Sequence, residues 1–164
     1  MRITSHFFHG VVSMKVIKQF SNDSGHKFAT IYTDLSQRLL MDVWNGAYGS
    51  ECNLTSVLGY TFAQLKTQDL RCWLCDVSQI EGDLTASAEA TVTLFDMLLS
   101  SSSLDKFAFV SQRPAHPARN GLTRVLEKHG VQVKVFATYP AAMDWLLVPS
   151  IEEDVWEDVP MMSF

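Results

Sequence analysis

The sequence predicts an α/β protein built on a mixed β-sheet, with an antiparallel N-terminal hairpin, parallel C-terminal strands and about four flanking helices. This prediction depends on three short apolar runs, at residues 71–78, 106–111 and 131–136, which are separated by segments with apolar residues at helical spacing. Apolar strands that alternate with amphipathic helices pair in parallel through right-handed crossovers, and both sheet faces are covered. We therefore expect helices to cover the large apolar side chains of these strands, namely Trp73, Leu74, Phe107, Phe109, Val133 and Val135.

The N-terminal part of the chain predicts the antiparallel strands. Residues 27–33 and 38–44 are strand-like and flank Asp34-Leu-Ser-Gln37, which is the pattern of a β-hairpin, and Asn45-Gly46 ends the second strand. A weaker strand-like run extends from Met14 to Phe20. We interpret residues 1–26 as an N-terminal extension that could contribute an extra strand, residues 27–149 as one domain, and residues 150–164 as an acidic and apolar tail.

Four helices are predicted from apolar spacing and end signals. The first follows Ser50 as its N-cap, the third stops at His129-Gly130, and the fourth begins at Thr138 and is ended by Pro149. The apolar residues expected to face the sheet are Leu54, Val57, Leu58, Phe62 and Leu65 in the first helix, Ala88, Val92, Phe95 and Leu99 in the second, Leu122, Val125 and Leu126 in the third, and Met143, Trp145 and Leu146 in the fourth.

The charge distribution argues against nucleic acid as a partner. Five of the 18 acidic residues lie in the tail, between Glu152 and Asp158, and the remaining acids equal the 13 Lys and Arg in number. A neutral body lacks the basic stripe that a nucleic-acid-binding surface needs. We expect no nucleic-acid binding.

The sequence also predicts a cytoplasmic protein without integral membrane contact. No apolar run approaches the roughly 20 residues that span a bilayer. The first ten residues contain His and Ser where a secretory signal would have an uninterrupted apolar stretch. Three cysteines, Cys52, Cys72 and Cys75, are an odd number in a chain of 164 residues, which favours reduced thiols.

A family resemblance rests on four segments. They are Met41-Asp-Val-Trp-Asn-Gly46, Trp73-Leu-Cys-Asp76, Phe107-Ala-Phe-Val110 and the final strand and helix at 136–146, which close on Ala-x-x-Trp-Leu. Over residues 27–148 the chain resembles STAS-like domains of the anti-sigma-factor-antagonist type. It is also similar to the short uncharacterised bacterial proteins grouped beside them and to the CRAL-TRIO lipid-transfer fold.

The resemblance implies a non-enzymatic regulatory or ligand-binding module that often pairs with partners. In the phosphoregulated members a Ser or Thr lies where the first parallel strand turns into its helix. The matching region here is 82–87, so the resemblance implies Thr85 and Ser87 as candidate phosphorylation sites.

The pair Cys72-Trp-Leu-Cys75 has the spacing of a redox or zinc motif, but its position favours another interpretation. Redox and zinc pairs lie at helix N-termini or in tight knuckles, where both sulfurs converge. On a strand, residues three apart point to opposite faces. We therefore expect core cysteines that form neither a disulfide nor a zinc site, and no metal or cofactor.

One candidate ligand site lies at the carboxyl ends of the parallel strands, where α/β sheets place their sites. Asp76 and Ser78 end one strand and Ser111 ends the next. The loop that follows carries Arg113, His116 and Arg119 into a helix N-terminus. Arginines and a helix N-terminus bind anions, and His116 could act as an acid or base. The other interpretation is a proline-stiffened surface loop whose arginines pair with local acids.

Two functional hypotheses therefore remain open. The first is a non-catalytic module that acts by binding a protein partner or by forming a homodimer. The second is a protein or enzyme that binds a small anionic or lipid-like ligand at the strand ends. The tail mixes acids with Trp156, Met161, Met162 and Phe164, so it is either solvated or docked on the body or on another subunit.

Overall fold

The computed structural model describes residues 12–81, 88–112 and 117–148, with only the backbone described for 117–120. The strands are β1 (Lys15–Ser21), β2 (Lys27–Asp34), β3 (Leu39–Gly46), β4 (Cys72–Ile80), β5 (Lys106–Val110) and β6 (Gln132–Phe136). The helices are α1 (Glu51–Thr67), α2 (Ala88–Leu99), α3 (Pro117–Lys128) and α4 (Tyr139–Leu147).

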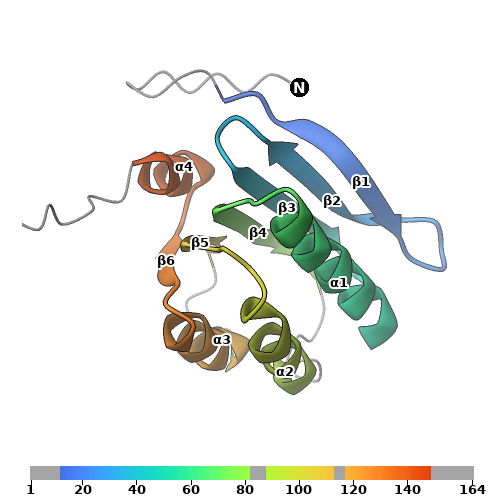
Figure 1. Cartoon of the computed structure of the whole chain (residues 1–164). Coiled ribbons are helices and arrows are strands. Elements are labelled where there is room, and N and C mark those ends of the chain that lie inside the picture. Colours follow the sequence, from blue (N-terminus) through green and yellow to red (C-terminus); the bar gives the residue numbers. More distant parts are fainter. Residues whose placement is uncertain (1–11, 82–87, 113–116, 149–164) are drawn as a thin grey trace, which may run out of the picture.

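The strands form one sheet in the order in which they occur along the chain (Figure 1). The pairs β1–β2 and β2–β3 are antiparallel, and β3–β4, β4–β5 and β5–β6 are parallel. The predicted mixed sheet with an antiparallel N-terminal part and parallel C-terminal strands is confirmed. Within residues 1–26, which the sequence suggested as an extension, Lys15–Ser21 form β1, and this strand belongs to the same sheet.

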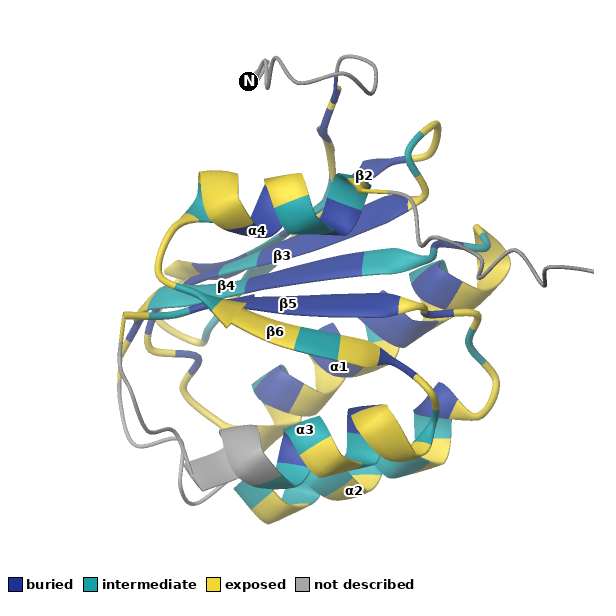
Figure 2. Cartoon of the chain, turned by 90° about the vertical axis from the view of Figure 1, so that its left-hand side faces the viewer, coloured by how far each residue is buried: buried dark blue, intermediate teal, exposed yellow. Residues whose placement is uncertain are grey.

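The helices divide unequally between the two faces of the sheet. Successive crossovers that progress in one direction along a sheet, all of the same hand, place their helices on one face. Accordingly α1, α2 and α3 lie on one side, and α4, which follows the last strand, lies alone on the other (Figure 2). We call these the three-helix face and the α4 face.

The three-helix face buries an aromatic core. The Trp73 ring stacks on Phe95 with centroids 5.3 Å apart, and Phe62 of α1 meets both rings edge to face. Phe107 packs edge-on against Trp73 at 4.8 Å. Trp73 and Phe107 are fully buried, as the alternation of their strands predicts.

The α4 face buries a smaller, mostly aliphatic core. Strand residues such as Leu39, Leu74 and Val110 pack against Met143 and Leu146 of α4. Val12 and Met14, which precede β1, join the same core. The short segment before β1 therefore contributes to this face together with the helix.

One core prediction was wrong. Val135 is 37% exposed, whereas Val133, two residues earlier on the same strand, is half-buried and packs against the aromatic core. The reason is that β6 is the edge strand of the sheet, with a neighbour on one side only, while α3 packs mainly against α2. Apolar alternation indicates which face a side chain takes, but it does not indicate whether the strand is central.

The helix-end signals were correct with one difference. Ser50 caps α1 by accepting a hydrogen bond from the Asn53 amide at 3.3 Å, and Gly130 follows α3 with a φ of +78°. Thr138 stands at the N-cap of α4, but its side chain makes no capping hydrogen bond. Within the described ranges, no helix combines the length and the apolar character needed to cross a membrane.

Candidate functional site

The structure places the first half of the predicted anion site at the expected edge of the sheet. Asp76 pairs with Val110, and Ser111 follows Val110 directly and donates its amide to the Phe136 carbonyl at 3.0 Å. The register of β3 and β4 shifts beyond Val43, so the end of β4 carries an extra residue there. Ser111 lies just beyond the end of β5, whereas Asp76 and Ser78 lie within β4, which continues to Ile80 beyond its pairing with β5.

Asp76 and Ser78 are hydrogen-bonded to each other. One carboxylate oxygen of Asp76 accepts the Ser78 hydroxyl at 2.6 Å and the Ser78 amide at 3.0 Å. This local turn supports the irregular end of β4. A carboxylate at this position also repels anions, so this end of β4 by itself does not offer an anion site.

The second half of the predicted site lies outside what the structure describes. Arg113 and His116 fall outside the described residues, and only the backbone of Arg119 is described, in the first turn of α3. Thr85 and Ser87, the candidate phosphorylation sites, also fall outside them, as does the tail from residue 150 onward. The anion site and the phosphorylation sites stay predictions.

The two cysteines of the CxxC sequence lie on opposite faces of the sheet, as strand alternation predicts. Cys72 packs on the α4 face and Cys75 in the aromatic core. Burial raises the pKa of the Cys72 thiol to about 11 and raises the pKa of Cys75 well above its ordinary value. Both thiols are therefore protonated at neutral pH, and they face in different directions.

Metal-ligating side chains do not gather anywhere in the described part of the chain. No group of three or more His, Cys, Asp or Glu residues there is placed to hold a metal ion.

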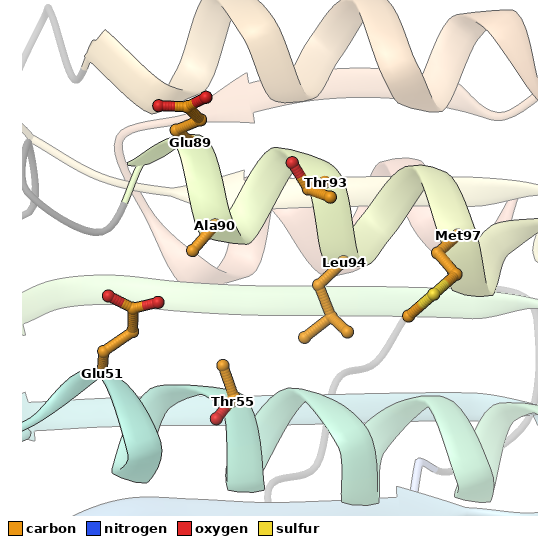
Figure 3. A pocket seen from close by; sticks show the side chains of 7 residues that line it. All are labelled: Glu51, Thr55, Glu89, Ala90, Thr93, Leu94 and Met97. Atoms are coloured by element: carbon orange, nitrogen blue, oxygen red, sulfur yellow. The ribbon is translucent and has the colours of Figure 1, made fainter.

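The described residues form an open groove between α1 and α2. Its volume is about 480 Å³, and its lining residues are Glu51, Thr55, Glu89, Ala90, Thr93, Leu94 and Met97. Figure 3 shows Leu94 and Met97 pointing from α2 toward α1, and Glu51 pointing from the first turn of α1 toward α2. Glu89 lies at the same end of the groove, in the first turn of α2, and its carboxylate points away from α1 (Figure 3).

Close to the sheet, α1 and α2 are in contact through aromatic side chains. There Phe62 of α1 and Phe95 of α2 meet edge to face, with centroids 5.0 Å apart. Farther from the sheet, Leu94 and Met97 of α2 face Thr55 of α1 across the groove (Figure 3). Met97 is 64% exposed, although it is a large apolar side chain.

Sequence reasoning missed this groove, although a signal was present. Ala90, Leu94 and Met97 lie at spacings i, i+4 and i+7, a second apolar stripe on α2 beside the one that faces the sheet. A helix with two apolar stripes has one face left over after packing on its sheet. That second stripe predicts an additional contact surface.

Comparison with known proteins gives a distant structural likeness. A scan against protein-family models finds no match, and a search of curated proteins also finds none. Among solved structures, the chain is similar to an uncharacterised protein of the DUF3478 family from Shewanella loihica PV-4, described as having a SpoIIAA-like fold. The two share 19% sequence identity with a TM-score of 0.43, over 87% of this chain and 98% of the other. No functional conclusion follows from a likeness at this level.

Proposed function

We propose that the protein is a non-catalytic binding module that docks a basic, amphipathic segment of a partner protein in the α1–α2 groove. The observation that carries this proposal is the strongly exposed Met97 beside half-buried Leu94, in a groove whose charged lining residues are both acidic. Apolar residues in a groove between helices are how amphipathic helices are recognised, and methionine adapts its shape to varied partners.

The acidic residues that line the groove indicate that the docked segment of the partner is positively charged. Glu51 and Glu89 stand at one end of the groove, and none of its lining residues is Lys, Arg or His. A complementary segment carries Lys or Arg at the end that meets these glutamates, followed by apolar residues that reach Leu94 and Met97. The attraction between opposite charges increases the association rate and fixes the direction in which the segment lies.

A second copy of the chain is a poorer occupant. Among the described residues, α3 is the basic helix, with Arg124 and Lys128, but its apolar residues Leu122 and Leu126 are already buried in the aromatic core. Donating this helix to a neighbour would expose that core. The charge complementarity therefore favours a different protein as the partner.

The reactivity of the buried side chains supports binding and not turnover. Burial raises the pKa of both Cys72 and Cys75, which leaves their thiols protonated and poorly nucleophilic. Asp76 is held by Ser78 on its own strand. These groups serve the packing of β4.

A synthetic helical peptide of lysine and leucine provides the probe, and the same peptide with glutamate in place of lysine provides its charge control. Fluorescence anisotropy of the labelled peptides against the full chain should show binding of the basic peptide only. Met97→Ser and the double change Glu51→Gln, Glu89→Gln should each weaken binding by about tenfold, since each removes on the order of 1.4 kcal/mol of contact.

Matched controls are available elsewhere on the surface. Leu35→Ser removes a comparably exposed apolar side chain, 58% exposed in the β2–β3 turn, and Glu127→Gln removes an exposed acid on α3. Both controls should bind as the unmodified chain does. Equal binding of the two peptides, or binding that all variants retain, would rule out the groove. A concentration-dependent dimer that Met97→Ser dissociates in sizing experiments would show that a second copy is the occupant.

A further inference from the structure

A single carboxylate lies inside the aromatic core, at Asp42 in the middle of β3. Asp42 is 0% exposed, and in the sheet it pairs with Ile31 of β2 and with Cys75 of β4. Sequence alternation puts it on the three-helix face, together with Leu40 and Trp44 of the same strand. The aspartate therefore lies on the face that the three helices cover, and it is excluded from water.

Two indole groups bind this carboxylate. Trp44 Nε1 donates to one oxygen at 2.9 Å, and Trp73 Nε1 donates to the other, also at 2.9 Å. The Cys75 thiol adds a third hydrogen bond. The segments that carried the family resemblance, Met41–Gly46 and Trp73–Asp76, thus meet in space around one acid.

No cation accompanies the carboxylate in the described part of the chain. From β2 the facing residue is Ile31, and from β4 the titratable neighbour is Cys75, which is uncharged at neutral pH. The buried residues of α1 are apolar except Thr61, whose hydroxyl has no hydrogen-bond partner. Lys106, the buried cation, donates to carbonyls at the end of α4 on the opposite face.

These contacts set the balance between the two protonation states. Removal from water favours the neutral acid, while the hydrogen bonds from Trp73, Trp44 and Cys75 favour the carboxylate. Burial is the larger effect, and it raises the pKa of Asp42 from 3.8 to about 6. Without a nearby cation, three neutral hydrogen-bond donors do not fully offset the free-energy cost of burying the ionised carboxylate.

We propose that Asp42 is a proton-binding site within the core, and that uptake of this proton on mild acidification stabilises the folded chain. The sign follows from linkage. A group that binds its proton more tightly in the folded chain stabilises the fold at low pH, and this stabilisation is lost as pH rises through the folded-state titration. Asp42 therefore contributes more to the free energy of unfolding at pH 5 than at pH 7.5.

Urea unfolding of the full chain, followed by circular dichroism between pH 4.5 and 7.5, tests this proposal. The contribution of Asp42 to the folding equilibrium constant should be roughly tenfold larger at pH 5 than at pH 7.5, given the direction and size of its displacement. In Asp42→Asn this component should disappear, whatever the absolute stability of the variant. Histidine titrations contribute equally to both proteins and cancel in the comparison.

Asp34→Asn is the matched control, because Asp34 is also buried, at 4% exposure, in the same sheet. Four hydrogen bonds hold its carboxylate, and its pKa is lowered, so it titrates below this window. The Asp34→Asn chain should keep the pH dependence of the unmodified protein between pH 5 and 7.5. A dependence that survives in Asp42→Asn would overturn the proposal.

A direct titration covers the case in which Asp42→Asn does not fold. In the unmodified chain labelled with ¹³C at aspartate carboxyl carbons, the Asp42 resonance should move with a midpoint near 6 in native conditions. A midpoint at or below 3.8, the ordinary aspartate value, would show that the core stabilises the ionised form of Asp42, and this result would overturn the proposal.

Discussion

The two faces of the sheet are stabilised in different ways. The three-helix face is stabilised mainly by its buried aromatic side chains, in which Trp73, Phe95 and Phe107 contact one another directly. The α4 face has fewer and smaller apolar side chains, and polar groups attach its outer elements at their ends. This face is covered by one helix of nine residues, of which Ala142, Met143 and Leu146 are buried.

The attachment of α4 depends on a buried lysine. Lys106 lies on β5 at 5% exposure, and its ammonium donates to the carbonyls of Val148 at 2.6 Å and Trp145 at 3.2 Å. These carbonyls belong to the end of α4, where a cation also interacts favourably with the helix dipole. The last turn of α4 has no basic residue of its own, so a residue distant in sequence supplies the charge.

Two buried aspartates, Asp42 and Asp34, also differ in what surrounds them. Asp42 lies among aromatic rings with only neutral donors, and burial raises its pKa. For Asp34, burial again raises the pKa, but hydrogen bonds from the Ser36 side chain and from three backbone amides outweigh that effect and lower it. The surroundings of Asp42 thus favour its neutral, protonated form, whereas those of Asp34, at the margin of the other face, favour the carboxylate.

The largest effect is expected in the aromatic core. Phe107→Ala should reduce the free energy of unfolding by about 3–5 kcal/mol, because it removes a fully buried ring and leaves a cavity between Trp73 and Phe109. Urea unfolding at constant pH measures this loss. Phe136→Ala, at a half-buried position against α4, should cost clearly less. Equal losses at the two positions would contradict the proposed difference between the faces.

A smaller effect is expected at the α4 attachment. Lys106→Met keeps most of the side-chain volume but leaves two carbonyls without their donor, which should cost about 1–3 kcal/mol. Hydrogen exchange of the α4 amides should accelerate more than exchange in the strands. Lys134→Met is the control, since Lys134 lies over the Trp145 ring at 5.6 Å, as Lys106 does at 5.3 Å, but is exposed. Matching effects in the two variants would show that the ring contact, and not the carbonyls, holds α4.

The smallest effect is expected at the N-terminal segment. Asp34→Asn removes the oxygen that accepts the Ser13 amide at 2.8 Å, which should cost about 1 kcal/mol at pH 7. Because the folded-state pKa of Asp34 is lowered, its stabilisation is present above its ordinary value and is lost as pH falls through the folded-state value. The variant should therefore show a weaker loss of stability than the unmodified chain in acid titrations below pH 4. An unchanged acid transition would mean that Asp34 does not contribute to it.

The sequence by itself determined the local features of this protein. The hairpin at 27–46, the helices and the opposite directions of Cys72 and Cys75 all follow from periodicity and turn residues, which depend on neighbours along the chain. The proximity of Asp76 to Ser111 also follows, because β4 and β5 pair in parallel with Asp76 beside Val110. The same alternation places Asp42 on the side of Trp44, although only its residue type among apolar neighbours signalled anything unusual.

Tertiary structure decided the remainder. The order of the strands made β6 an edge, which left Val135 exposed despite its apolar pattern. The pairing of β3 with β4 brought the Trp73 indole to Asp42 across 31 positions of sequence, and this contact has no local signal. The groove between α1 and α2 likewise depends on how two helices separate above Phe62 and Phe95. Periodicity reports which face of an element is apolar, whereas strand order and helix spacing determine which of those faces remain open to a partner or to a proton.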